Sequence, residues 1–357
     1  RNLTVTTGAA SLDIIVPVTI SGGVNLTASN GAINVDAPIN TPSSNTQQFR
    51  ATDGITFTSN GELNGGSSLD LNADTDADGT GTLTFAAGTS IVGNFIDFEA
   101  AGIQIDRVID GSGFLRLTPS TDSASIGLGT SVGDFALDDS ELANLDNGFS
   151  QIEIGQIFGG THAILIESAT FTDDVRIGGN QPGGSITIND GLTSTDNSEI
   201  ALVGSGGNGA AFPGSATTFI NSDITAARNL IIDDKVELQT DVTLTSPFIL
   251  ISGFVDGTAG TESLTTNGET NLLADVGATV PLGSLTVNGS AGFFGGSLST
   301  NGTQTFGGEF LIGNGSAGVT TLNAGGDVTF GLTVSVATND PTDFFAPPPD
   351  EWSGNQR

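Results

Sequence analysis

The chain has 357 residues with 40 acidic and 8 basic side chains, and its net charge of −32 argues against nucleic-acid binding, which needs clustered Lys and Arg. It contains no Cys, so disulfide bonds and thiolate metal sites are excluded. No segment approaches the roughly 18 consecutive apolar residues of a transmembrane helix, so we expect no membrane insertion.

The composition also argues against the two ordinary globular domains that this length would suggest. The chain has 52 Gly, many Thr, Ser, Asn and Asp, and only 36% hydrophobic residues, which never gather into long helical patterns. A narrow core shared along a stack of coils tolerates such a composition, because each coil buries only a few side chains. The chain begins with Arg1 and has no apolar signal segment, so we expect a processed product or a piece of a longer protein.

Short apolar or β-branched runs, separated by Gly, Asn, Asp and Ser, recur from one end of the chain to the other. Several alternate strictly, as Ile186 and Ile188 do around Thr187, which is the period of a half-buried strand. The expected strands are Leu3–Thr7, Asp13–Ile20, Val24–Ala28, Ala32–Ala37, Gly54–Thr58, Thr82–Ala86, Phe95–Glu99, Gly102–Asp106, Phe114–Thr118, Gln151–Gly155, Ala163–Glu167, Ser185–Asn189, Glu199–Val203, Thr217–Asn221, Asn229–Asp233, Asp241–Thr245 and Phe248–Ser252.

The turns between these runs fit either hairpins or the corners of a solenoid. Asn-Gly pairs such as Asn267-Gly268 and Asn288-Gly289 suit both, because Asn and Gly tolerate positive φ. The runs return every ~20–25 residues, and no linker divides the chain, which favours a parallel β-helix of roughly 12–16 coils over separate sandwich domains.

An acidic loop follows the first few expected coils. Asp74, Asp76 and Asp78 alternate with small residues and are followed by Gly79. Oxygen ligands at positions 1, 3 and 5 with Gly at position 6 are typical of a calcium loop, but Phe85 replaces the acid expected at position 12. Two interpretations remain open: a calcium site and a solvated acidic loop. No other cofactor is expected.

Residues Leu137–Leu145 (LDDSELANL) predict a short helix. Asp138 can cap its N-terminus, and Glu141 falls at the N3 position of a capping box. A helix of two turns cannot stand alone, so it should lie on the outside of the stack or cover one of its ends. It is interpreted either as a surface insertion between coils or as a partner-binding helix.

Two segments differ from the repeating pattern. Gly204–Gly214 is a Gly-rich loop, expected to protrude, and no Lys-Ser or Lys-Thr follows it as in a phosphate-binding loop. The tail, Asp340–Arg357, contains three consecutive prolines that impose an extended form. Its apolar residues Phe344, Phe345 and Trp352 are candidate assembly anchors, so the tail is either a linker or an arm that docks into a neighbouring subunit.

The most regular part of the chain carries a family resemblance. Asn301–Phe306 (NGTQTF) and Gly325–Phe330 (GGDVTF) resemble repeats of the filamentous haemagglutinin-type exoproteins of bacterial two-partner secretion, and the resemblance is specific over Ser263–Ser335. It implies a right-handed parallel β-helix, secretion, and adhesion or fibre formation. The chain contains no Asn-Pro, part of the signature of the secretion domain of such proteins, so the resemblance implies a shaft segment or a processed subunit.

Polysaccharide lyases and hydrolases can share the same fold, so an enzyme must also be considered. Such hydrolases need clustered Asp residues with His and basic residues. The candidates here lie in different regions of the chain: Asp138-Asp139, Asp173-Asp174, Asp233-Asp234, His162, Arg176 and Lys235. We therefore expect structural roles for them, and a −32 surface would repel a polyanionic substrate.

The sequence thus predicts an all-β protein, a right-handed parallel β-helix over residues 1–339 with one short helical insert and a Pro-rich tail over 340–357. The expected function is that of an extracellular or cell-surface adhesin shaft, not an enzyme. Its expected partners are further copies stacked head-to-tail into filaments, with surface glycans or other cells as additional candidates. The alternative is a carbohydrate-active enzyme or a glycan-binding surface protein.

Overall fold

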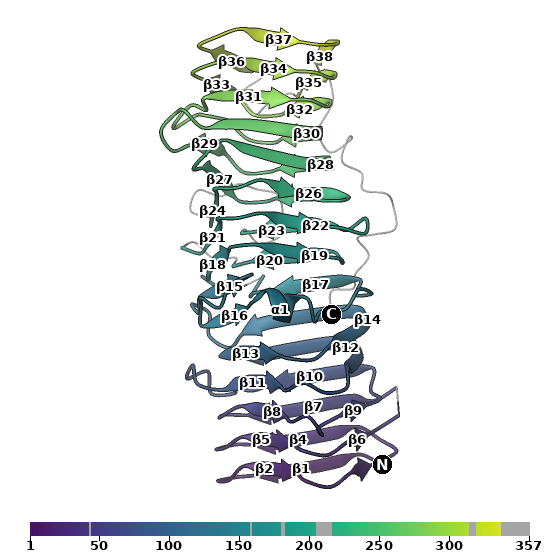
Figure 1. The fold of residues 1–357 in the computed structure, drawn as a ribbon. Helices are drawn as coiled ribbons and strands as arrows, with labels where there is room; N and C mark the ends of the chain where they lie inside the picture. Colours follow the sequence, from purple (N-terminus) through teal and green to yellow (C-terminus); the bar gives the residue numbers. More distant parts are fainter. Residues whose placement is uncertain (43, 158, 180–182, 205–215, 314–318, 337–357) are drawn as a thin grey trace.

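The protein is a long parallel β-solenoid of about 14 turns, as the computed structural model shows (Figure 1). The structure describes residues 1–357 except 43, 158, 180–182, 205–215, 314–318 and 337–357. The predicted Gly-rich loop and the tail anchors Phe344, Phe345 and Trp352 therefore lie outside the described residues. Within the described part, no helix is long and apolar enough to cross a membrane.

A typical coil contributes three short strands, one to each face of the rod. The N-terminal coils contain β1 (Leu3–Thr7), β2 (Leu12–Ile14), β3 (Val18–Thr19), β4 (Val24–Ala28), β5 (Ile33–Val35), β6 (Ile39–Asn40), β7 (Thr46–Ala51), β8 (Ile55–Phe57), β9 (Leu63–Asn64), β10 (Ser68–Asn72), β11 (Thr82–Phe85), β12 (Ile91–Ala100), β13 (Gly102–Ile105) and β14 (Ile109–Pro119).

The central coils contain β15 (Ile126–Leu128), β16 (Phe135–Leu137), α1 (Asp139–Leu142), β17 (Gln151–Ile154), β18 (Ala163–Ile166), β19 (Ala169–Phe171), β20 (Val175–Gly178), β21 (Ser185–Ile188), β22 (Leu192–Ser194), β23 (Ile200–Val203), β24 (Thr217–Ile220), β25 (Ile224–Thr225), β26 (Asn229–Ile232) and β27 (Lys235–Leu238).

The last coils contain β28 (Val242–Ile251), β29 (Val255–Gly257), β30 (Ser263–Leu272), β31 (Ser284–Val287), β32 (Ala291–Phe293), β33 (Ser297–Thr300), β34 (Gln304–Phe306), β35 (Phe310–Ile312), β36 (Thr321–Ala324), β37 (Val328–Phe330) and β38 (Val334–Val336). Long strands such as β28 and β30 bend around a corner and so belong to two faces. The expected strands Asp241–Thr245 and Phe248–Ser252 are in fact this single strand β28, with a register shift between Thr245 and Phe248.

The core is built from files of inward-facing side chains in parallel register. On the face that begins with β1, one apolar residue of each coil pairs with its counterpart in the next. This file runs through Val5, Leu26, Phe49, Leu71, Phe98, Leu117, Ile154, Ile177, Leu202, Ile232, Ile251, Leu272, Phe293, Ile312 and Val336. Between coils the spacing is near 4.8 Å, so each member buries its neighbours on both sides.

Every pairing between named strands is parallel, so the Asn-Gly turns are corners and not hairpins. Glycine is required at these corners mainly because adjacent coils stack too closely to leave room for a side chain. A Cβ on Gly61 would lie 2.0 Å from the carbonyl oxygen of Val35 in the coil below, and one on Gly289 would lie 2.1 Å from that of Gly268. Among the Asn-Gly corners named above, only Gly268 has the positive φ that the left-handed interpretation expects.

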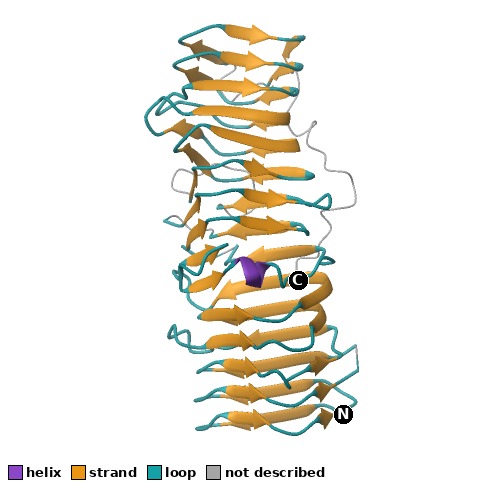
Figure 2. Cartoon of the chain, in the orientation of Figure 1, coloured by secondary structure: helices purple, strands orange, loops and turns teal. Residues whose placement is uncertain are grey.

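The predicted helix is confirmed, although it is shorter than Leu137–Leu145. Helix α1 has Asp138 as its N-cap, and the reciprocal bonds between Asp138 and Glu141 form the expected capping box. Glu141 and Leu142 are buried, and the helix lies midway along the rod instead of at an end (Figure 2). It follows β16, which pairs with β15 and interrupts the otherwise regular order of strands on that face.

Candidate metal centre

The acidic loop predicted from the sequence lies at a corner of the fourth coil. It connects β10, which ends at Asn72, to β11, which begins at Thr82. The backbone N–H of Thr75 donates to the carbonyl of Ala51 in the third coil, and that of Ala73 donates to the carbonyl of Glu99 in the fifth. The base of the loop is therefore held by the ladders on both sides.

The loop closes on its own first residue. The N–H of Gly79 donates to Oδ2 of Asp74 at 3.1 Å, and the N–H of Asp74 donates to Oδ1 of Asn72 at 3.0 Å. Ala77 and Gly79 adopt positive φ values of 52° and 86°. Small residues at these two places allow the tight reversal that brings alternate side chains to the same side.

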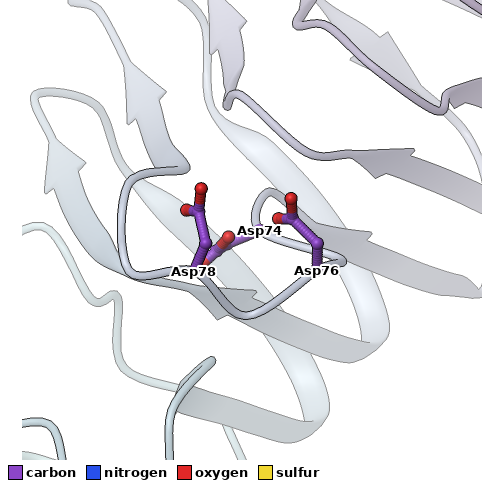
Figure 3. A group of neighbouring side chains, drawn as sticks. All are labelled: Asp74, Asp76 and Asp78. Atoms are coloured by element: carbon purple, nitrogen blue, oxygen red, sulfur yellow. The ribbon is translucent and has the colours of Figure 1, made fainter.

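The three predicted ligands are brought together by this reversal. Asp74, Asp76 and Asp78 each offer an oxygen, and these oxygens all lie within 4.8 Å of one another. Figure 3 shows the carboxylate of Asp74 between the side chains of Asp78 and Asp76. Asp76 and Asp78 are exposed, whereas Asp74 is buried with 1% of its surface accessible. The cluster is thus open on one side and closed at its base.

Asp74 is fixed by a residue of a later coil that the sequence analysis did not select. The hydroxyl of Ser120, at the end of β14 in the sixth coil, donates to Oδ2 of Asp74 at 2.6 Å. Its other oxygen, Oδ1, is buried and has no hydrogen-bond partner among the described residues. Nothing in the sequence links two residues 46 positions apart, and only the stacking of coils brings them together.

The electrostatics of the loop disfavour three bare carboxylates. Loss of water, then a hydrogen bond with the Asp74 carboxyl and the charge of Asp78, raise the pKa of the Asp76 carboxyl, and a backbone hydrogen bond opposes this rise. Phe85, which occupies the position of the missing twelfth-residue ligand, is fully buried in the core. A cation at this loop would find three carboxylates among the described residues and would need water to complete its shell.

The residues considered for an enzyme make separate contacts in the described structure, although the charge of Arg176 acts on Asp233 and opposes the rise that burial causes in the pKa of that carboxyl. Asp138 caps α1, Asp173 accepts the N–H groups of Gly148 and Phe149, and Asp174 pairs with Arg228. Arg176 lies 3.9 Å from Glu153, and Lys235 lies 3.8 Å from Asp256. Nδ1 of His162 donates to the carbonyl of Ala124, and burial lowers the pKa of this imidazole.

A ladder of charged residues runs along the outer side of the face that begins with β1. Asp70, Asp97, Arg116, Glu153 and Arg176 follow one another in register across five consecutive coils. Arg116 lies 3.5 Å from Asp97 and 3.1 Å from Glu153 and so separates these two acids, whereas Asp70 and Asp97 are direct neighbours in the ladder. Burial raises the pKa of Asp97, and the positive charge of Arg116 opposes this effect.

No protein-family model, curated protein or solved structure matches this chain.

Proposed function

We propose that the chain is the structural shaft of an exported, extracellular or cell-surface protein, of the adhesin or filament type that its haemagglutinin-like repeats suggest. The observation that carries the proposal is the unbroken apolar file from Val5 to Val336. A core of this kind produces a long, stiff rod, because each coil packs only against the coils before and after it.

The sides of the rod suit a shaft that stays soluble at high density. Outward positions carry Thr, Asn, Asp and Glu, and the net charge is −32. Such a surface resists non-specific association. The few basic residues of the described coils are largely used within the molecule, as Arg50 pairs with Asp70 and Arg116 pairs with Asp97 and Glu153.

The last described coil suits end-to-end growth. The apolar side chains of this coil are exposed by between 37% and 64%: Val328 and Phe330 in β37, Leu332, and Val334 and Val336 in β38. Among the described strands, β38 pairs only with β35, so no described strand covers its outer edge. An apolar strand edge attracts further strands, and another coil is the natural occupant. We propose that a second copy supplies that coil.

The experiment is sedimentation velocity and negative-stain microscopy over a range of protein concentrations. We expect rods that lengthen with concentration by whole-molecule increments. The double variant Val334→Lys with Val336→Lys should keep the rods single, since Lys on an edge strand opposes pairing. The matched control, Val92→Lys with Val132→Lys, adds the same charge at exposed positions away from the end and should assemble like the wild type.

Single rods of the wild-type protein at all concentrations would rule out self-assembly but not the shaft. Equal assembly of both double variants would place the contact elsewhere than at β38. A carbohydrate-active enzyme remains the alternative, and turnover of a neutral or acidic polysaccharide by the purified chain would favour it over the shaft.

A further inference from the structure

We propose that the loop of Asp74, Asp76 and Asp78 is a calcium site that clamps one corner of the solenoid. The inference is separate from end-to-end assembly and holds whether or not the rods stack. It rests on the position of three carboxylates and on one buried oxygen that has no partner in the described structure.

The spacing of the carboxylates fits one cation. Calcium lies about 2.3–2.6 Å from its oxygen ligands, so two ligands of the same ion are at most about 5 Å apart. The ligand oxygens of the three aspartates lie within 4.8 Å of one another. One ion can therefore reach all three with little rearrangement of the loop.

The buried base of the loop provides the independent argument. Among the described residues, Oδ1 of Asp74 is closed off from solvent and has no amide or hydroxyl donor, while Oδ2 accepts from Gly79 and Ser120. A buried carboxylate oxygen without a partner is costly, because the charge loses its water and gains nothing in return. A cation bound against this oxygen would satisfy it and would also offset the repulsion between Asp76 and Asp78.

Calcium suits the donor set better than magnesium. Calcium accepts an irregular shell of carboxylates, carbonyls and water, whereas magnesium requires near-octahedral geometry and gives up its water reluctantly. The loop lacks the bidentate acid that tightens such sites, and two of its three ligands are exposed. We therefore expect a dissociation constant of about 0.1–1 mM, the range of extracellular calcium modules.

The position of the site gives binding a structural effect. Asp74 belongs to the fourth coil and Ser120, which holds it, to the sixth. An ion on Asp74 orders the loop between β10 and β11 and strengthens the corner where three successive coils meet. Calcium should thus raise the melting temperature of the intact protein, by about 2–4 °C at a concentration ten or more times the dissociation constant.

The test is calorimetric titration of the chelator-treated 357-residue chain with calcium chloride and, separately, magnesium chloride. The wild type should bind one calcium ion per chain and magnesium at least about tenfold more weakly. The double variant Asp76→Asn with Asp78→Asn removes two exposed ligands and should weaken calcium binding more than tenfold, with loss of the thermal shift. Both positions are exposed, so the fold should survive, which circular dichroism checks.

The matched control is Asp13→Asn with Asp190→Asn, which removes the same charge at two exposed positions on other coils. It should bind calcium like the wild type. The proposal is overturned if the wild type binds no calcium up to about 10 mM, well above the expected range. It is equally overturned if both double variants lose binding to the same extent, or if magnesium binds as tightly as calcium.

Discussion

Nη1 of Arg107 donates a hydrogen bond of 2.6 Å to the carbonyl oxygen of Gly61, which lies two coils earlier in the rod. The same guanidinium also donates to the carbonyls of Ala86, one coil earlier, and Thr58, again two coils earlier, each at 2.6 Å. Arg107 is buried, with 2% of its surface accessible. One cation therefore joins three consecutive corners through their backbones.

Replacing Arg107 should destabilise the N-terminal coils strongly. In Arg107→Met the carbonyls of Thr58, Gly61 and Ala86 would lose a charged donor while staying near the core, and we expect a loss of about 2–4 kcal/mol. Urea unfolding followed by circular dichroism measures the change. The control Arg50→Lys alters a half-exposed ion pair with Asp70 and should cost less than about 1 kcal/mol. Equal losses in both variants would contradict the role of Arg107.

Asp234 should make the stability of the rod depend on pH near neutrality. Burial raises the pKa of this carboxyl to about 7, although a hydrogen bond from Thr218 opposes the shift. Because the folded-state pKa lies above the unfolded value of 3.8, the stabilisation is complete below about pH 4 and is lost as the pH rises through 7. Between pH 5 and 8 the wild type should lose about 2–3 kcal/mol.

The variant Asp234→Asn, which resembles the protonated acid, should lose much less stability over this interval. Thr218→Val removes the hydrogen bond that favours the charged form, so its pH dependence should be steeper than that of the wild type. Thermal melts at pH 5 and pH 8 compare the three proteins. If Asp234→Asn follows the wild-type curve, another group carries the titration.

Glu262 should contribute to stability with the opposite dependence on pH. Burial alone would raise its pKa, but hydrogen bonds from the backbone of Ala259 and Gly260 and from the Thr261 side chain outweigh burial and lower the pKa to about 2. The stabilisation from the Glu262 carboxylate is therefore present above the ordinary pKa of 4.5 and is lost as the pH falls through 2.

The variant Glu262→Gln should be less stable than the wild type at pH 7, and the difference should shrink towards pH 2. The melting temperatures of the two proteins at pH 7 and pH 2 measure this difference in stability. Glu269→Gln, at an exposed position of β30, should change stability by no more than about 0.5 kcal/mol at pH 7. A Glu262→Gln deficit that stays constant down to pH 2 would show that side-chain packing, and not charge, is responsible.

The repeating pattern predicted the solenoid because the alternation of apolar and polar residues, and the Gly, Asn, Asp and Ser residues at the turns, are local properties of the sequence. The helix was predicted for the same reason, since Asp138 and Glu141 are three residues apart. Strand limits were less accurate: the expected strand Asp13–Ile20 is divided by a corner into β2 and β3. Alternating hydrophobicity does not show where the chain turns, and the exposed Ile15 and Val16 lie at that corner.

The candidate metal site was found only in part. Asp74, Asp76 and Asp78 are close in sequence, so their spacing was enough to select them. Ser120 was missed because its position beneath Asp74 depends on how many residues each intervening coil contains. These numbers vary along the chain: successive members of the apolar file are 19 residues apart from Phe98 to Leu117 but 37 apart from Leu117 to Ile154.

The interruption of one face at β16 has a mechanical consequence. The sheet that begins with β1 is continuous, but the face that begins with β2 is divided, with β13 ending one sheet and β16 beginning the next. A tensile force along the rod pulls the coils apart across their ladders, which share the load at each junction. Among the described strands no pairing joins β13 to β16, so this junction lacks one ladder and should be among the first to separate in a stretched rod, beside α1.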